Sequence, residues 1–142
     1  KPGTESVAVI GLGSGVTPST VLLSDTIKQV DSIEIEKAVV SASNLFRPFV
    51  DRVYDEPRSH IHVDDAKNFF SVKQQQYDAI VFEPPKTWVS GVSTLISQEF
   101  YSRIKTHLKE DILNLLEDCE GEGQANISIA CLTSMGAIEI IY

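Results

Sequence analysis

Three glycines in close succession directly follow a short apolar run near the start of the chain. The run is Ser6-Val7-Ala8-Val9-Ile10, and the segment after it reads Gly11-Leu12-Gly13-Ser14-Gly15. An apolar run of this length bounded by glycines predicts a buried strand that ends in a tight turn. A turn without Cβ atoms lets a ligand approach the backbone closely. The chain is therefore expected to contain a strand, a bare turn and a helix in that order.

The glycine spacing favours one class of ligand. A second apolar segment ends at Ile33-Glu34-Ile35-Glu36, so that Glu34 follows Gly15 by 19 positions. An acid at this separation can accept hydrogen bonds from both hydroxyls of a ribose. A dinucleotide fingerprint would place its third glycine at the position of Val16. The pattern therefore predicts a nucleoside cofactor without a pyrophosphate, such as S-adenosylmethionine, held by Gly11, Gly13, Gly15 and Glu34. The alternative is a plain strand–turn–helix joint without a ligand.

Length and charge narrow the function further. The 142 residues are enough for one domain, which we expect to span 1–142. The net charge of −8, from 12 basic and 20 acidic residues, argues against sequence-independent binding to nucleic acid or anionic lipid. It leaves a cationic substrate open. No apolar run approaches the roughly 18–20 residues that span a bilayer, so no membrane contact is expected in this segment.

Cysteines and histidines give no metal signature. Cys119 and Cys131 stand in no metal or redox spacing, which favours reduced thiols in a cytoplasmic protein. His60 and His62 alternate along a predicted strand, so their side chains share one face. Two histidines without a third ligand favour solvated strand residues over a metal site. No metal is therefore expected.

Strand and helix signals alternate along the chain. Strands are predicted at 7–10, 29–35, 61–63 and 77–82, and helices at 17–28, 37–46, 65–71 and 97–109. The first helix is expected to begin with Thr17 as cap and Pro18 at its first position. Residues 47–59 and 83–93 are expected to be mostly loop, and 126–132 with 137–142 to form a hairpin. This order predicts an α/β fold with a doubly wound, mainly parallel sheet and an antiparallel C-terminal hairpin.

Ligands of such sheets bind outside the carboxyl ends of the strands. The glycine turn, Glu34, Asp65 and Glu83 each follow a predicted strand. All four are therefore expected to meet at one edge of the sheet.

Several motifs in sequence order resemble the spermidine synthase family, over about residues 5–109. They are Val7–Gly15, Glu34-Ile35-Glu36, Asp64-Asp65-Ala66-Lys67-Asn68, Tyr77-Asp78-Ala79-Ile80-Val81, Trp88-Val89-Ser90-Gly91-Val92-Ser93 and Glu99-Phe100-Tyr101. More narrowly, the chain resembles the spermidine-synthase-like branch of the class I S-adenosylmethionine-dependent transferases. The resemblance implies a Rossmann-like fold and S-adenosylmethionine or its decarboxylated form as cofactor.

The resemblance also implies roles for single residues. Glu34 would hold the ribose diol, and Asp65 would accept from the adenine amino group beside the backbone amide of Ala66. Asp65 could instead serve only as the cap of the helix that follows, and both roles can coexist. Glu36 is favoured as an acid at a helix start over a cofactor ligand. Trp88 could wall the acceptor pocket or be an ordinary packing residue.

The segment that starts at Glu83 would face the sulfonium centre and the acceptor, and here the chain departs from the family. Family aminopropyltransferases carry an Asp-Ser-Ser-Asp-Pro-like loop, whereas this chain has Glu83-Pro84-Pro85-Lys86-Thr87. The first acid is kept, and Glu83 is the candidate catalytic base; its alternative role is to hold the loop or the cofactor. Lys86 replaces the second acid and would repel a cationic amine. Methyl transfer or a different acceptor is therefore open beside aminopropyl transfer.

The chain is also expected to be incomplete. Lys1-Pro2-Gly3 begins abruptly, and no fifth strand follows the helix predicted at 97–109. We expect truncation at the N-terminus and an interruption near 108–111; the alternative is one helix that continues to Cys119.

Three functions are weighed: a group transferase acting on a small-molecule acceptor, a non-catalytic nucleoside-binding or interaction domain, and a nucleotide-dependent oxidoreductase, which Val16 disfavours. A homodimer is left open.

Overall fold

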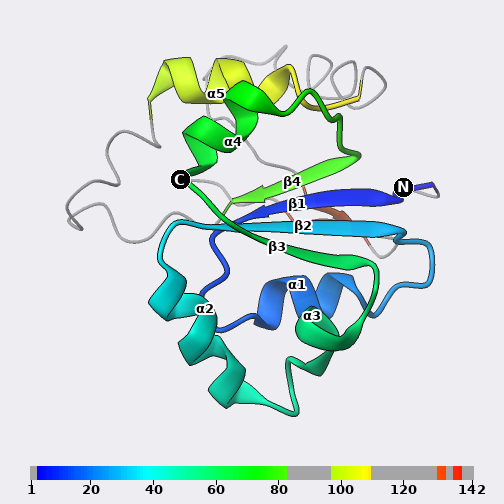
Figure 1. Ribbon diagram of the computed structural model, residues 1–142. Coiled ribbons are helices and arrows are strands. Elements are labelled where there is room, and N and C mark those ends of the chain that lie inside the picture. Colours follow the sequence, from blue (N-terminus) through cyan, green and yellow to red (C-terminus); the bar gives the residue numbers. More distant parts are fainter. Residues whose placement is uncertain (1–2, 83–96, 110–130, 134–135, 139–142) are drawn as a thin grey trace.

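The computed structural model describes residues 3–82, 97–109, 131–133 and 136–138 (Figure 1). Strands and helices alternate over these ranges, as the sequence predicts. In chain order the elements are β1 (Ser6–Ile10), α1 (Val16–Val21), β2 (Gln29–Glu34), α2 (Lys37–Ser43), the 3₁₀ helix η1 (Asn44–Phe46), α3 (Asp51–Asp55), β3 (Ser59–Val63), α4 (Ala66–Val72), β4 (Ala79–Phe82), α5 (Gln98–Lys105), β5 (Cys131–Thr133) and β6 (Gly136–Ile138).

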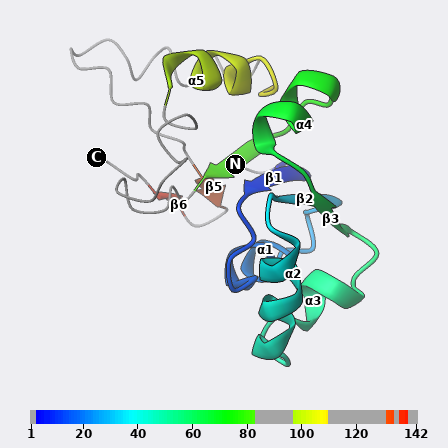
Figure 2. The ribbon, with the colours of Figure 1, turned by 60° about the vertical axis from the view of Figure 1, so that its left-hand side comes forward.

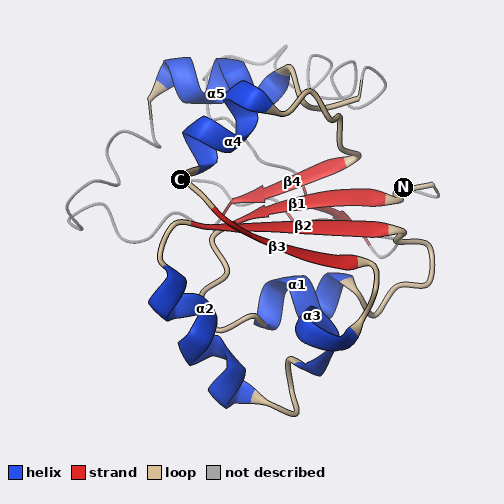
Figure 3. Cartoon of the chain, viewed as in Figure 1, coloured by secondary structure: helices blue, strands red, loops and turns tan. Residues whose placement is uncertain are grey.

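Four parallel strands form the central sheet in the order β3-β2-β1-β4. Helices α1, α2 and α3 cover one face of the sheet, and α4 and α5 cover the other (Figures 1 and 3). The same two helical layers are visible after rotation in Figure 2. Because the strands are parallel, their carboxyl ends lie at one edge. The predicted doubly wound sheet is confirmed for the described part of the chain.

The predicted C-terminal hairpin is also confirmed where the structure describes it. Strands β5 and β6 pair antiparallel, with Cys131 opposite Ile138 and Thr133 opposite Gly136. No helix within the described ranges is long and apolar enough to cross a membrane.

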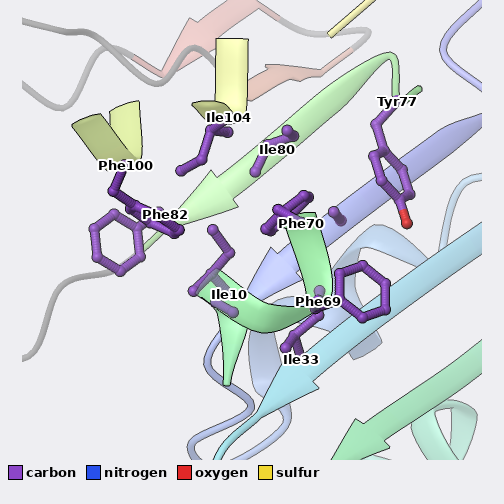
Figure 4. Packing of buried hydrophobic residues seen from close by; sticks show 11 residues of the cluster. Ile10, Ile33, Phe69, Phe70, Tyr77, Ile80, Phe82, Phe100 and Ile104 are labelled. Carbon is purple, nitrogen blue, oxygen red and sulfur yellow. The ribbon is translucent and has the colours of Figure 1, made fainter. Parts of the chain in front are cut away.

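Apolar side chains fill both interfaces between sheet and helices. On the α4 and α5 side, Phe69 and Phe70 of α4 and Phe100 and Ile104 of α5 pack over the sheet (Figure 4). Burial of such side chains is the main favourable term in folding. On the other face, Leu22 and Ile27 cover a second cluster that includes Val30. Phe100 and Ile104 are four positions apart, so they lie on the one face of α5 that packs against the sheet.

Helix α1 is shorter than predicted and begins differently. Its N-cap is Gly15 rather than Thr17, and Pro18 is its third residue. The helix ends at Val21 instead of near Lys28, because the guanidinium of Arg58 holds the turn that follows. It donates to the carbonyl oxygens of Leu22 (2.9 Å), Ser24 (3.0 Å) and Ile27 (2.7 Å). The backbone groups of this turn therefore bond to a distant side chain rather than to a continuing helix.

Two further boundaries differ from the prediction. Residues 51–55, expected as loop, form α3. Helix α5 has Ser97 as its N-cap and ends at Lys105, so the alternative of one helix through Cys119 is wrong. After α5 the chain turns back to the sheet, where Leu108 makes a parallel bridge with Tyr77. The interruption expected near 108–111 stays a prediction, because residues 110 and 111 lie outside the described residues.

Asp78 ties three segments together at the start of β4. Its Oδ2 accepts from the backbone N–H of Glu5 (3.0 Å) and of Ser6 (2.9 Å), and its Oδ1 accepts from Lys109 Nζ (2.8 Å). Burial acts to raise the pKa of Asp78, but the hydrogen bonds from Lys109, Glu5 and Ser6 outweigh it and lower this pKa to about 2. The carboxylate is thus held ionised where β1, β4 and the end of the α5 segment meet.

Candidate functional site

The glycine turn after β1 is open above its backbone. Gly11, Gly13 and Gly15 have φ angles of 89°, 54° and 83°, which residues with a Cβ rarely adopt. A Cβ placed on Gly11 or on Gly13 would meet no atom within 4 Å. Side chains therefore do not block the bend, and a ligand can lie against it.

Leu12 points the opposite way, into the protein. It is 3% exposed and packs with Val50 and Val53. The N–H of Gly15 donates to the carbonyl of Leu12 at 2.8 Å and closes the turn. The turn thus has an open glycine side and an anchored leucine side.

Glu34 reaches back to this turn from the end of β2. Its Oε2 accepts from the backbone N–H of Leu12 at 2.9 Å, and its Oε1 accepts from the N–H of Glu36 at 3.0 Å. The residue is 8% exposed. A carboxylate has about four acceptor positions, so two amide donors leave capacity for two hydroxyl groups. The prediction that Glu34 faces the glycine turn is confirmed.

Backbone hydrogen bonds join the three loops at this edge. The N–H of Gly11 donates to the carbonyl of Ile33 at 2.8 Å, and the N–H of Asp64 donates to the carbonyl of Glu34 at 3.1 Å. The start of the loop after β3 is therefore held next to Glu34. The glycine turn, Glu34 and Asp65 converge at the sheet edge as predicted.

Asp65 is exposed and caps α4. Its Oδ1 accepts from the N–H of Lys67 at 2.8 Å, and Ala66 behind it is buried. The predicted cap role is confirmed, and the exposed carboxylate has further acceptor positions for a ligand. Glu36 caps α2 in the same way, by accepting from the N–H of Ala38 at 3.1 Å. Its interpretation as a helix-start acid is confirmed.

Glu83, Lys86 and Trp88 lie outside the described residues. Strand β4 ends at Phe82, whose register partner in β1 is Ile10. The chain therefore leaves β4 directly beside the strand end that carries Gly11.

A second polar group lies inside the sheet layer rather than at its edge. Asp31 of β2 accepts from the hydroxyl of Tyr77 at 2.9 Å, and its other oxygen lies 2.6 Å from His62 Nε2. Burial and the charge of Asp31 raise the pKa of Tyr77, so the phenol remains a donor. His60 is exposed, as predicted for a solvated strand residue, whereas His62 is only partly exposed because it lies against Asp31. In the ranges that the structure describes, no three His, Cys, Asp or Glu side chains are grouped to hold a metal ion.

These residues fit an adenosine-containing group. A bare turn accommodates a close-lying ligand, an anchored carboxylate suits a ribose diol, and an exposed acid at the next loop suits an amino group. Sequence reasoning missed Val50, Asp31 and the inward role of Leu12. Their partners lie far away in sequence, so only Leu12, apolar between two glycines, carried a local signal.

Comparison with known proteins identifies relatives. Residues 1–135 match the family model described as the spermine/spermidine synthase domain. A polyamine aminopropyltransferase of Alkaliphilus oremlandii is 33% identical over 110 residues, which are 78% of this chain and 38% of that protein. Polyamine aminopropyltransferase 2 of Bacillus cereus is 30% identical over 108 residues, covering 74% of this chain and 30% of its own length. The matched part of the chain thus spans about a third of the length of these curated relatives.

Solved structures share the fold. A spermidine synthase in complex with the transition state analogue AdoDATO has a TM-score of 0.70 at 24% identity and covers 77% of this chain and 37% of its own. Human methyltransferase-like protein 13 in complex with SAH has a TM-score of 0.62 at 17% identity, over 81% of this chain and 59% of its own. The described sheet and helices therefore have the Rossmann-like arrangement of both proteins.

Proposed function

Because the chain belongs to the spermine/spermidine synthase family, we propose that it binds decarboxylated S-adenosylmethionine and transfers the aminopropyl group to an amine acceptor. The observation that carries this proposal is the Glu34 carboxylate, anchored by the Leu12 N–H beside an unobstructed glycine turn. The names of the relatives, polyamine aminopropyltransferases, support the transferred group.

The described residues would hold the cofactor by its nucleoside end. Glu34 would accept from the ribose hydroxyls, and Asp65 from the adenine amino group, with the N–H of Ala66 beside it. Gly11 and Gly13 would provide the backbone surface under the ligand. The bound sulfonium supplies an electrophilic carbon, so the protein has to align an acceptor with it and take up a proton. We assign the uptake of this proton to Glu83, because this residue follows β4 directly in the sequence.

The net charge of −8 suits a cationic acceptor, because opposite charges attract the substrate to the protein. Lys86, in the segment that follows β4, would instead repel a cationic acceptor. It favours methyl transfer as a second candidate function; the fold is also that of human methyltransferase-like protein 13, whose solved structure is a complex with SAH.

Calorimetry with three ligands separates the candidates. We expect decarboxylated S-adenosylmethionine to bind more tightly than S-adenosylmethionine, and NAD not to bind. The reverse order of the first two would favour methyl transfer. Binding of NAD alone would favour the oxidoreductase and overturn the proposed transferase.

Product analysis separates an enzyme from a non-catalytic binding domain. The protein is incubated with decarboxylated S-adenosylmethionine and a linear diamine, and the amines are analysed by mass spectrometry. An aminopropylated amine is expected. Cofactor binding without any transfer to amines would instead support the interaction domain.

The acceptor as a small molecule, a homodimeric assembly and a cytoplasmic location are further parts of the proposal. The small-molecule acceptor is suggested by the family, and the cytoplasmic location by two cysteines without metal or redox spacing. Sedimentation velocity tests the homodimer, which a single monomeric species would exclude.

A further inference from the structure

A valine from a distant segment packs underneath the glycine turn. Val50 precedes α3 and is 0% exposed. A Cβ placed on Gly15 would lie 3.5 Å from both Cβ and Cγ1 of Val50. Leu12 belongs to the same buried cluster, together with Val53. Val50 therefore supports the turn at Leu12 and at Gly15.

Two hydroxyl groups hold the segment around Val50 in place. Ser19 of α1 donates from Oγ to the carbonyl of Phe49 at 3.1 Å, next to Val50. Tyr54 of α3 donates from its hydroxyl to the carbonyl of Val40 in α2 at 2.9 Å. The segment is thus tied to both neighbouring helices, and Val50 is a fixed support rather than a loose contact.

The support reaches the carboxylate through one residue. The side chain of Leu12 rests in the cluster with Val50, and the backbone N–H of Leu12 donates to Glu34 Oε2 at 2.9 Å. A shift of the Leu12 side chain therefore moves the amide that orients Glu34. We infer that Val50 is a positioning residue of the adenosyl site, acting through Leu12 on the carboxylate that would grip the ribose. This inference rests on the proposed function.

The test compares two equal truncations in different places. Val50→Ala removes the support, whereas Val7→Ala removes the same two methyl groups at the start of β1. Val7 is 3% exposed and belongs to the buried cluster of Leu22, Ile27 and Val30, which does not include Leu12. Val50→Ala is expected to weaken the binding of decarboxylated S-adenosylmethionine about 10-fold, which corresponds to partial loss of one charge-assisted hydrogen bond. Val7→Ala should leave the dissociation constant unchanged.

A double-mutant cycle shows whether Val50 acts through Glu34. If it does, Val50→Ala has little effect on affinity in a Glu34→Ala background, so the two changes are not additive. Hydrogen exchange gives a readout without ligand: the Leu12 amide should exchange faster in Val50→Ala but not in Val7→Ala. A purely stabilising residue would change affinity equally in both backgrounds.

The outcomes separate this inference from the proposed function. If the unaltered protein binds no adenosyl compound, the proposed function fails and the inference falls with it. If it binds, but Val50→Ala changes neither affinity nor Leu12 exchange, or acts additively with Glu34→Ala, only the inference is overturned. Should Val50→Ala not fold, Ser19→Ala serves in its place, because it loosens the same segment by one hydrogen bond. It should give a smaller effect in the same direction.

Discussion

At the scale of single residues, one carboxylate organises the candidate site. Glu34 receives amide donors from the glycine turn through Leu12 and from its own loop through Glu36. It therefore fixes the turn and presents its remaining acceptor positions at the same time. A neutral side chain would provide neither the charge nor the pair of oxygens.

Replacing Glu34 with Ala should weaken binding of the adenosyl cofactor by about 10- to 100-fold. The change removes charge-assisted hydrogen bonds worth roughly 1.5–3 kcal/mol. Calorimetry measures the effect, with circular dichroism to verify folding. Glu36→Ala is the matched control: this acid caps α2, so its loss should lower stability and leave affinity unchanged. Equal affinities for Glu34→Ala and the unaltered protein would contradict the ribose role.

Asp65 can be tested for its cap and its ligand role separately. Asn is as good an N-cap as Asp, so Asp65→Asn should keep the stability of α4. It should weaken cofactor binding, because an amide NH₂ can turn a donor toward the adenine amino group. Asp65→Ala should lose both, with about 1 kcal/mol of stability. Unfolding midpoints measure the cap role, and calorimetry measures the ligand role. If Asp65→Asn bound the cofactor as tightly as the unaltered protein, Asp65 would have the cap role alone.

Local pattern was sufficient to predict these residues. The glycines and Asp65 follow a strand and Glu34 ends one, and strand ends are marked by apolar runs and glycines in the sequence. Val50 and Asp31 were not predictable in the same way. Val50 looked like part of a polar loop with prolines, and its value comes from its contact with a turn in another part of the chain. Asp31 is an acid inside a buried strand, and its hydrogen bonds with Gln29, Tyr77 and His62 explain its burial.

At the scale of elements, long-range hydrogen bonds decide where helices end. The stretch after α1 was predicted to continue the helix, but three of its carbonyl oxygens accept from Arg58. The local sequence does not indicate that an arginine just before β3 will bind these carbonyl groups. Helix α3 was missed for a related reason, since its stability comes from packing of Val53 rather than from propensity.

Arg58→Ala should therefore destabilise the fold by about 2–4 kcal/mol, because three partly buried carbonyl groups lose their donor. Arg58→Lys should recover only part of this, since an ammonium cannot reproduce the planar guanidinium fork. Arg103→Ala is the control, as Arg103 is exposed and bonds to Ser71 Oγ. Urea unfolding gives the three values. Equal losses for Arg58→Ala and Arg103→Ala would contradict this role.

The hydrogen bonds that Asp78 accepts from Glu5, Ser6 and Lys109 predict that the stability of the fold falls at low pH. The pKa of Asp78 is lowered to about 2 in the folded protein, below its ordinary value of 3.8. A lowered pKa means that the ionised form is stabilised by folding, so the contribution is complete above about pH 4 and is lost as the pH falls toward 2. It amounts to roughly 2 kcal/mol. The free energy of unfolding of Asp78→Asn should be lower than that of the unaltered protein at pH 5, and the gap should narrow by pH 2. If the free energies of unfolding of the two proteins changed in parallel with pH, this role of Asp78 would be contradicted.

At the scale of the whole molecule, the ligand should act as part of the fold. The candidate site joins the ends of β1, β2 and β3, and a bound cofactor would connect all three loops. At a ligand concentration of 100 times the dissociation constant, binding adds about 2.7 kcal/mol to stability. For a chain of this size, the melting temperature should rise by roughly 5–10 °C. Scanning calorimetry with decarboxylated S-adenosylmethionine tests this, and NAD should give no shift.

The strand order separates two tasks along the sheet edge. The described groups that would grip the nucleoside come from β1, β2 and β3, all within residues 11–66, whereas the segment that would face the acceptor follows β4. A lineage could therefore exchange one acceptor for another by altering the segment behind β4 alone. The nucleoside grip would be inherited intact, and a chimera that receives this segment from a relative would retain its cofactor while changing its product.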